Sequence, residues 1–450
     1  MTYGPSSLSQ NKSRSKHTAE NKKEYGDRVR TRIFVRLNST QLLWATCEHI
    51  VNGQKAQTSH LLFMLDISRL RDQFPDFSSY QMHEQALLAG KLKRALDAIT
   101  DCAGDWKELR DQVEAVRPKW LVAGLRSSPA GVATCGPRPT PISVVATDGS
   151  QIYPDRHVEP TCYLLNVSRI AFHYGTVEQP LMESVPFFRY RRPEVEETED
   201  PLLGGATPEV VSALRDEAEL KALLAVAMAV RKSERPLVAL ADGTLIRWMI
   251  RLMQNPDLEA RLITSYTKTL SRFREKKIPL CAYISMPGNM EVVNLLRVYL
   301  GETDDDESDS ETSLAGLTDR LIFERVLSPG ERSATFETAS HIQREYGVDR
   351  ICYFYVHIPS QSGGAEIGRV EIPHWIADDN RLVDLIHAVV LSECEKGDGY
   401  PMILSEAHEK VVIRAQEKEH FYELIAREMA ILGVLFSASR KQVSKRRPLV

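Results

Sequence analysis

Short apolar runs bounded by turn residues alternate with longer amphipathic stretches over residues 140–435 of this chain. Runs rich in apolar and β-branched residues are typical of buried strands. They predict strands at residues 142–147, 161–170, 237–241, 278–286 and 351–358, with an edge strand at 369–372. Helices are predicted at 207–231, 290–300, 382–394 and 401–417. Strands that alternate with helices in this way indicate an α/β domain.

Two of these helices have recognisable start signals. Thr207 precedes Pro208, an arrangement typical of an N-cap followed by the first helical turn. Pro401 is expected in the first turn of the last helix. Tyr400 would then lie at the mouth of that helix and His408 two turns further in.

The two ends of the chain have a different pattern. Residues 1–28 are predicted to form a disordered basic tail, and residues 29–130 a mostly helical region with amphipathic stretches. A Pro-, Gly- and Ser-rich loop then leads to the α/β domain. Residues 436–450 are predicted as a second basic tail, and residues 302–311 as an acidic loop inserted in the domain.

Composition and charge add limits to this picture. With 43% hydrophobic and 26% charged residues and a net charge of −4, the 450-residue chain has an ordinary globular composition. Basic tails can contact a phosphate backbone or a partner, although solvated chain ends more often have this composition. The seven cysteines form no C-x-x-C pair, which favours free thiols in a reducing compartment over a zinc site. The polar N-terminus and the lack of an apolar stretch of about 18 residues predict a cytoplasmic protein with no membrane span.

The candidate chemistry begins where two of the predicted strands end. One strand runs into Asp148-Gly149-Ser150 and another into Asp242-Gly243-Thr244. Either Asp-Gly pair alone is more typical of a turn than of a catalytic site. Two aspartates at the carboxyl edge of neighbouring strands would instead bring like charges together, and a divalent cation would neutralise them. Mg²⁺ and Mn²⁺ prefer such oxygen ligands, and pairs of these ions are common in phosphodiester hydrolysis.

Further candidates lie elsewhere in the chain. The helix before the second aspartate offers Glu219 as a third carboxylate, with Glu217 as an alternative, and an exposed salt-bridged turn is an equally reasonable interpretation. His408, beside apolar residues, is by itself more typical of a histidine at the boundary of the core than of a catalytic one. Ser150 and Thr244 could cap a following helix or bind a phosphate oxygen.

Taken as a set, these motifs resemble the NurA family of DNA-end-processing nucleases. The resemblance covers roughly residues 140–420 and includes two more stretches, residues 282–287 and the segments 318–320 and 327–333. It implies an RNase H-like mixed α/β sheet flanked by helices, and a dimer with a central channel. It also implies cleavage of DNA from the 5′ end in double-strand break repair, with Mn²⁺ as cofactor (Mg²⁺ as the alternative, two ions per site). The implied partners are DNA and a hexameric HerA-type ATPase.

The family's functional residues carry over to matching positions. The resemblance makes Asp148, Asp242 and, less directly, Glu219 metal ligands, and it adds Tyr400 and His408 to the catalytic set. Thr244 stands where the family often has Ser, which keeps the hydroxyl. The acidic insertion and the basic N-terminal extension have no counterpart that the resemblance explains.

The expected roles follow from this assignment. His408 would bind metal or donate a proton to the leaving oxygen, and Tyr400 would contact the scissile phosphate or stack on the terminal base. Ser150 and Thr244 would help to place the phosphate, and Arg156, Arg247 and the basic tails would follow the DNA backbone. Two other classes remain open: a catalytically weak, DNA-associated scaffold for the ATPase, and a metal-dependent phosphohydrolase of small molecules. The absence of a G-x-x-x-x-G-K-[ST] motif disfavours a nucleotide-binding enzyme.

Overall fold

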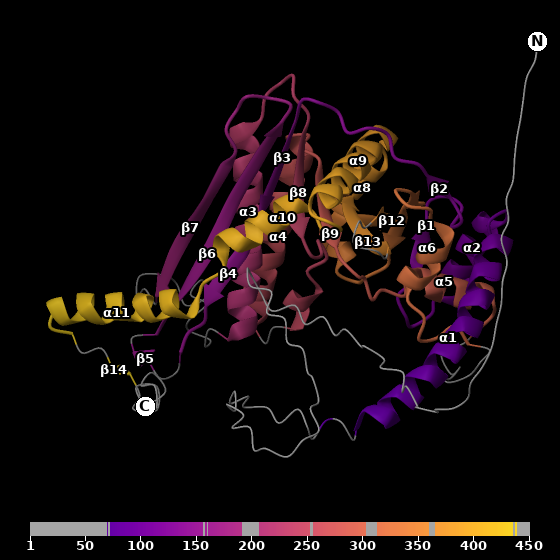
Figure 1. The fold of residues 1–450 in the computed structure, drawn as a ribbon, viewed down its shortest axis with the longest axis horizontal. Helices are drawn as coiled ribbons and strands as arrows, with labels where there is room; N and C mark the ends of the chain where they lie inside the picture. Colours follow the sequence, from indigo (N-terminus) through magenta and orange to yellow (C-terminus); the bar gives the residue numbers. More distant parts are fainter. Residues whose placement is uncertain are drawn as a thin grey trace, which may run out of the picture. The chain divides into compact units, whose positions relative to one another are not determined.

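A mixed β-sheet runs through the part of the chain that the structure, a computed structural model, describes (Figure 1). The described residues are 70, 73–155, 158–159, 161–190, 207–252, 255–302, 313–359, 365–434 and 437–438. Twelve of the described strands belong to this sheet. The predicted N-terminal tail, most of the acidic loop and most of the C-terminal tail lie outside the described residues.

The strands of the sheet follow the order β1-β11-β12-β13-β9-β8-β3-β6, with β7 on the other side of β6. Strands β3, β8 and β9 are parallel to one another, and the other neighbours in this order are antiparallel. The bounds are β1 Ala123–Leu125, β3 Ile142–Thr147, β4 Gly149–Ile152, β6 Cys162–Tyr174, β7 Leu181–Tyr190, β8 Leu237–Asp242, β9 Leu280–Ile284, β11 Phe336–Thr338, β12 Ile351–Pro359 and β13 Ala365–Pro373. Short strands β2 (Val132–Ala133) and β10 (Arg332–Ser333) pair beside β12, and β5 (Val158–Glu159) pairs with β14 (Ser437–Ala438) in a separate sheet.

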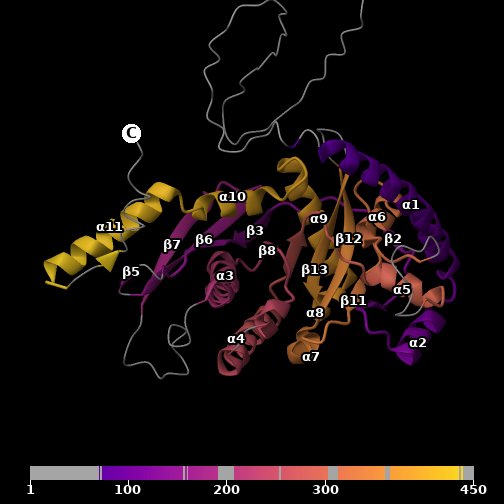
Figure 2. The ribbon, with the colours of Figure 1, turned by 90° about the horizontal axis from the view of Figure 1, so that it is seen from below.

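Helices cover both faces of the sheet, as Figure 2 shows for α3 and α4 on one side and α9 and α10 on the other. The first face packs against α3 (Pro208–Val230) and α4 (Pro256–Glu275) through Val145, Ala239 and Ala282. The second face packs against α8 (His374–Ala377), α9 (Asn380–Lys396) and α10 (Met402–Val411). The expected mixed α/β sheet flanked by helices is therefore confirmed.

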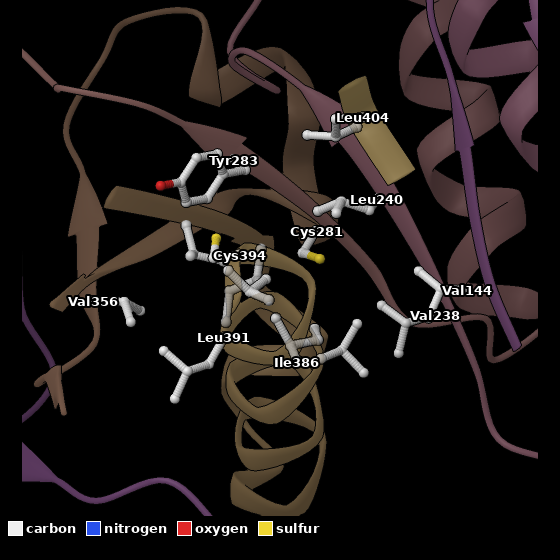
Figure 3. Packing of buried hydrophobic residues seen from close by; sticks show 14 of the residues in the cluster. Val144, Val238, Leu240, Cys281, Tyr283, Val356, Ile386, Leu391, Cys394 and Leu404 are labelled. Atoms are coloured by element: carbon white, nitrogen blue, oxygen red, sulfur yellow. The ribbon is translucent and has the colours of Figure 1, made fainter. Parts of the chain in front are cut away.

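The core under α9 and α10 contains the alternate residues of the central strands. Val144, Val238, Leu240 and Cys281 point toward Ile386 and Leu404 in this cluster (Figure 3). Because side chains alternate along a strand, residues 148 and 242 fall on the same face as residues 144 and 238. Both aspartates therefore lie on the α10 face of the sheet.

The helices near the start of the described chain do not form a separate domain. Helices α1 (Phe74–Asp101) and α2 (Trp106–Val116) share one hydrophobic core with α5 (Glu291–Tyr299), α6 (Asp319–Val326) and residues of β12. Residues 70–450 form one compact unit, and β1 and β2 join the main sheet. The sequence predicted this helical region ahead of a domain that begins near residue 140, and in the structure its helices bury their apolar faces against the same sheet.

Two other predictions differ from the structure, and one strand was missed. The segment 369–372 belongs to β13, which lies between β12 and β9 and is not an edge strand. The helix predicted over 401–417 is two helices, α10 and α11 (Ala415–Ile431), separated by extended residues around Val412. Strand β7 was not predicted. The remaining short helices are η2 (Trp248–Leu252), α7 (Gln343–Tyr346) and η3 (Gly347–Asp349), and none of the described helices is long and apolar enough to cross a membrane.

Candidate active site

Asp148 and Asp242 lie side by side at the carboxyl ends of β3 and β8. Strands β3 and β8 are parallel neighbours, and their register pairs Thr147 with Ala241. The residues that follow are therefore adjacent, on strands that are typically about 4.8 Å apart. The sequence predicted this convergence, and the strand register confirms it.

The chain leaves the two aspartates in different ways. After Asp242, Gly243 adopts a φ of +73° and turns the chain. At Asp148 the chain instead continues along β6, because β3 and β4 pair with β6 in one unbroken register. Ser168 secures the junction: its hydroxyl accepts from Asp148 N at 2.9 Å, and its own N–H donates to Asp148 O at 2.8 Å. The turn and helix start expected after Asp148 are therefore wrong, since the strand pairing with β6 continues.

Tyr400 and His408 reach these carboxylates from α10 and the loop before it. The Tyr400 hydroxyl donates to Asp242 Oδ1 at 2.7 Å, and His408 Nδ1 lies 2.9 Å from Asp148 Oδ2. Burial, together with the charge of Asp242, raises the pKa of Tyr400, so the phenol keeps its proton. The His408 side chain is 65% exposed, which excludes the core-boundary interpretation of this histidine. The imidazole is therefore largely exposed while Asp148 holds its Nδ1.

Glu219 approaches Asp148 from the opposite face of the sheet. Gly149 makes this approach feasible, because a Cβ at this position would lie only 2.7 Å from Arg215 Cγ and would overlap Glu219 Oε1. Oε1 lies 3.0 Å from Arg215 Nε as an ion pair, but it accepts no hydrogen bond within the described part of the chain. Burial raises the pKa of Glu219 to about 8; Arg215 opposes the shift, and the charges of Asp216 and Asp148 add to it.

The alternative carboxylate, Glu217, points elsewhere. It pairs with Lys221 at 2.7 Å and with Arg261 of α4 at 3.5 Å. On α3, Glu219 is therefore the glutamate that faces the aspartates. Arg247, expected to follow DNA, is 13% exposed and pairs with Asp216 at 3.2 Å. Arg156 lies outside the described residues.

The hydroxyls expected to bind phosphate have partners within the chain. Ser150 Oγ donates to the carbonyl of Val411, at the end of α10. Thr244 Oγ1 donates to Glu371 Oε2 at 2.8 Å and accepts from Ile246 N at 2.9 Å. Both hydroxyls thus donate to groups of the chain itself, and their contact with phosphate stays a prediction. Ser150 does not cap a helix, because it lies within strand β4.

The carboxylates of this site meet part of what a hard divalent cation requires from a protein. Two adjacent carboxylates, together with a Glu219 oxygen that accepts no hydrogen bond within the described residues, offer the kind of oxygen donors that Mg²⁺ and Mn²⁺ prefer. No three His, Cys, Asp or Glu side chains among the described residues are grouped closely enough to enclose an ion. Such ions commonly bind one or two carboxylates and complete their coordination with water and substrate phosphates. The pair Asp148 and Asp242 therefore suits a site that the substrate completes.

The NurA domain model matches residues 142–413. The structure is similar to that of the NurA nuclease from Sulfolobus solfataricus, at 14% identity and a TM-score of 0.42, over 66% of this chain and 87% of that one. It is also similar to LC9-RNase H1, a type 1 RNase H with the type 2 active-site motif, at 11% identity and a TM-score of 0.20, over 36% and 71% of the two chains. No curated protein matches the sequence.

The domain match and the sheet together decide the classification. The expected family resemblance and the mixed α/β sheet flanked by helices are confirmed. The matched segment contains Asp148, Glu219, Asp242, Tyr400 and His408. Because it also covers more than half of the chain, this protein belongs to the NurA domain family.

Proposed function

We propose that this protein is a metal-dependent nuclease that shortens DNA from its 5′ end. The single observation that carries the proposal is the parallel register of β3 and β8, which brings Asp148 and Asp242 together on one face. Tyr400 and His408 meet the same two carboxylates from α10. The proposal includes Mn²⁺ as cofactor, with Mg²⁺ as the alternative, and end processing during double-strand break repair.

In this proposal, residues of the chain bind the cations, orient one another and supply a proton to the leaving oxygen. Asp148 and Asp242 are the ligands for the cation pair, and Glu219 adds a third carboxylate from α3. When bound, the cations would lower the pKa of a water molecule and neutralise charge on the phosphate. Tyr400 donates to Asp242 and so fixes one carboxylate, while Asp148 orients the His408 ring. The exposed Nε2 of His408 is then placed to give a proton to the leaving oxygen.

The partners belong to the same proposal. The NurA protein of Sulfolobus solfataricus is a nuclease, and we infer nuclease activity on DNA for this chain. A hexameric HerA-type ATPase would drive DNA toward the site, and a homodimer would enclose it. Purified protein with and without such an ATPase, analysed by light scattering, would test both associations.

The decisive experiment replaces one oxygen donor without changing its shape. In Mn²⁺, Asp148→Asn should lower degradation of 5′-labelled single- and double-stranded DNA to below about 1% of the wild-type rate, because each tenfold loss needs only about 1.4 kcal/mol. The thermal midpoint should stay within a few degrees, since Asp148 lies at the surface end of the core. Cleavage at the wild-type rate by this variant would refute the assignment of Asp148.

The second candidate is a scaffold that has the fold but only weak catalysis. The acidic residues that this proposal assigns to catalysis, Asp148, Asp242 and Glu219, are all present in the chain, which favours the enzyme. The same assay decides between the classes: a scaffold would bind labelled DNA in Mn²⁺ without shortening it. A phosphohydrolase would instead release phosphate from small substrates and leave DNA intact.

A further inference from the structure

A chain of buried polar residues runs behind the acidic pair, on the face of the sheet opposite α10. It begins at Thr244, two residues after Asp242, and continues through Glu371 and Arg369 of β13 to Glu291 of α5. Arg369 is 0% exposed and Glu371 is 1% exposed. Buried charges of this kind are costly unless they are fully paired, so such a cluster calls for a function.

Glu371 holds the turn that follows Asp242. Its Oε2 accepts from Thr244 Oγ1 and from Leu245 N, both at 2.8 Å. Thr244 Oγ1 in turn accepts from Ile246 N at 2.9 Å. One carboxylate oxygen therefore secures the backbone directly behind the aspartate.

Glu371 is itself fixed from the other side. Arg369 Nε donates to Glu371 Oε1 at 3.0 Å. The guanidinium lies 3.5 Å above the ring of Tyr353, and its Nη2 pairs with Glu291 Oε1 at 3.2 Å. With charge partners on two sides and an aromatic ring below, Arg369 has little freedom to move.

We propose that Glu371 is a positioning residue for Asp242, and that Arg369 locks it in place. This inference rests on the proposed function, because it assigns Glu371 to the metal site through Asp242. Residues that orient the ligands of a metal site commonly change metal affinity or activity by 10- to 100-fold when they are replaced. Glu371 does not touch the candidate site, since it acts from the opposite face of the sheet through the turn at residues 243–246.

The test measures the turn and the metal site separately. Glu371→Gln removes the charge that Arg369 and the turn share and keeps the shape of the side chain. Hydrogen–deuterium exchange without metal should show faster exchange in the peptide that contains Leu245. Mn²⁺ titration without DNA should show binding weakened by about tenfold or more, and kcat for DNA cleavage should fall while KM changes little.

Two further variants separate positioning from general destabilisation. Thr244→Val removes one of the two contacts with Glu371, so it should change exchange and Mn²⁺ affinity in the same direction, and its effect should not add to that of Glu371→Gln. Glu302→Gln is the control. It removes a largely buried carboxylate that pairs with Arg297 at 2.9 Å and accepts from Leu314 N, beyond the end of α5 opposite to Glu291. It should lower the thermal midpoint but leave exchange at Leu245 and Mn²⁺ affinity near wild type.

The outcomes are distinct. Unchanged exchange at Leu245 together with wild-type Mn²⁺ affinity in Glu371→Gln would overturn the positioning role while leaving the nuclease proposal intact. Equal losses of Mn²⁺ affinity in Glu302→Gln and Glu371→Gln would also overturn it, because the effect would then be one of stability. A wild-type protein that neither binds Mn²⁺ nor cleaves DNA would refute the proposed function itself.

Discussion

Two glycines beside the acidic pair act through different physical effects. Gly243 has positive φ, a backbone conformation that costs other residues roughly 1 kcal/mol or more. Gly149 has an ordinary backbone conformation but leaves no room for a side chain, because Arg215 and Glu219 fill the space. The close approach of α3 to β4 therefore depends on the missing Cβ at position 149.

Gly149→Ala should lower both stability and activity. The added methyl group must push Glu219 and Arg215 away, at a cost of about 2 kcal/mol in the free energy of unfolding. Cleavage of DNA should fall as well, since Glu219 moves away from Asp148. Urea denaturation and a cleavage assay measure the two effects.

The matched control is Gly90→Ala on the exposed part of α1, where a Cβ meets nothing within 4 Å. This variant should gain about 0.5–1 kcal/mol of stability, because alanine favours the helix, and should keep its activity. A Gly149→Ala protein as stable and active as Gly90→Ala would contradict the packing argument.

At this scale, the sequence was informative about the residues that carry the chemistry. Asp148 and Asp242 could be predicted because each follows a short apolar run, and the resemblance added Tyr400 and His408. Glu371 and Arg369 could not be predicted. A charged residue in an alternating strand is more typical of a solvated face, and only the pairing of β13 between two strands shows that these side chains are buried. The hydrogen bond from Thr244 Oγ1 to Glu371 could not be predicted for the same reason.

At the scale of elements, α3 separates two glutamates that the sequence could not distinguish. Thr207 starts the helix by accepting a hydrogen bond from Val210 N, as predicted from the sequence. From that start, Glu219 faces Gly149 of β4, while Glu217 faces Arg261 of α4. The orientation of one helix thus decides which carboxylate belongs to the site.

The pair Glu219→Gln and Glu217→Gln tests this division. Glu219→Gln should reduce Mn²⁺-dependent cleavage by about tenfold or more, because a metal-directed carboxylate is lost. Glu217→Gln should leave the rate near wild type and lower stability slightly, since it loses ion pairs with Lys221 and Arg261. Steady-state cleavage and thermal melts measure both; a reversed order of the two rates would assign the site to Glu217.

Elements themselves were predictable where their patterns were regular. Strands β3, β8, β9 and β12 and helix α3 lie close to their predicted positions, because each combines a periodic apolar pattern with clear boundaries. Strand β7 was missed since it carries Pro186 and has no buried residue among its ten, as befits an edge strand. The break between α10 and α11 was missed because Val412 and Ile413 continue the apolar pattern without a glycine or proline.

For the molecule as a whole, the buried His387 links stability to pH. It lies in α9, and burial lowers the pKa of its imidazole to about 4. The unfolded chain binds a proton near pH 6.5, whereas the folded chain does not until about pH 4. Protonation of His387 therefore favours the unfolded chain. Its contribution to the free energy of unfolding is fully present above about pH 6.5 and is lost as the pH falls to about 4.

His387→Leu should remove this part of the acid sensitivity. Relative to the variant, the wild type should lose up to about 3 kcal/mol between pH 6.5 and pH 4, with little further change above pH 7. Urea denaturation at several pH values measures the difference. Parallel stability curves for the two proteins would show that His387 does not titrate in this range.

The organisation of the whole chain was only partly predictable. The α/β class followed from the alternation of strands and helices, whereas the extent of the sheet did not. Strands β1 and β2 are only three and two residues long, too short to give a periodic signal, yet they join the helices of residues 74–116 to the main sheet. A short strand is specified by its partner in space, which the local sequence does not contain.

Anomalous diffraction from crystals grown with Mn²⁺ and DNA would show whether Asp148 and Asp242 bind one cation site. We expect a manganese peak within bonding distance of carboxylate oxygens from both residues, and no such peak in Asp148→Asn crystals. A manganese peak that contacts neither aspartate, or one that persists unchanged in Asp148→Asn, would contradict this expectation.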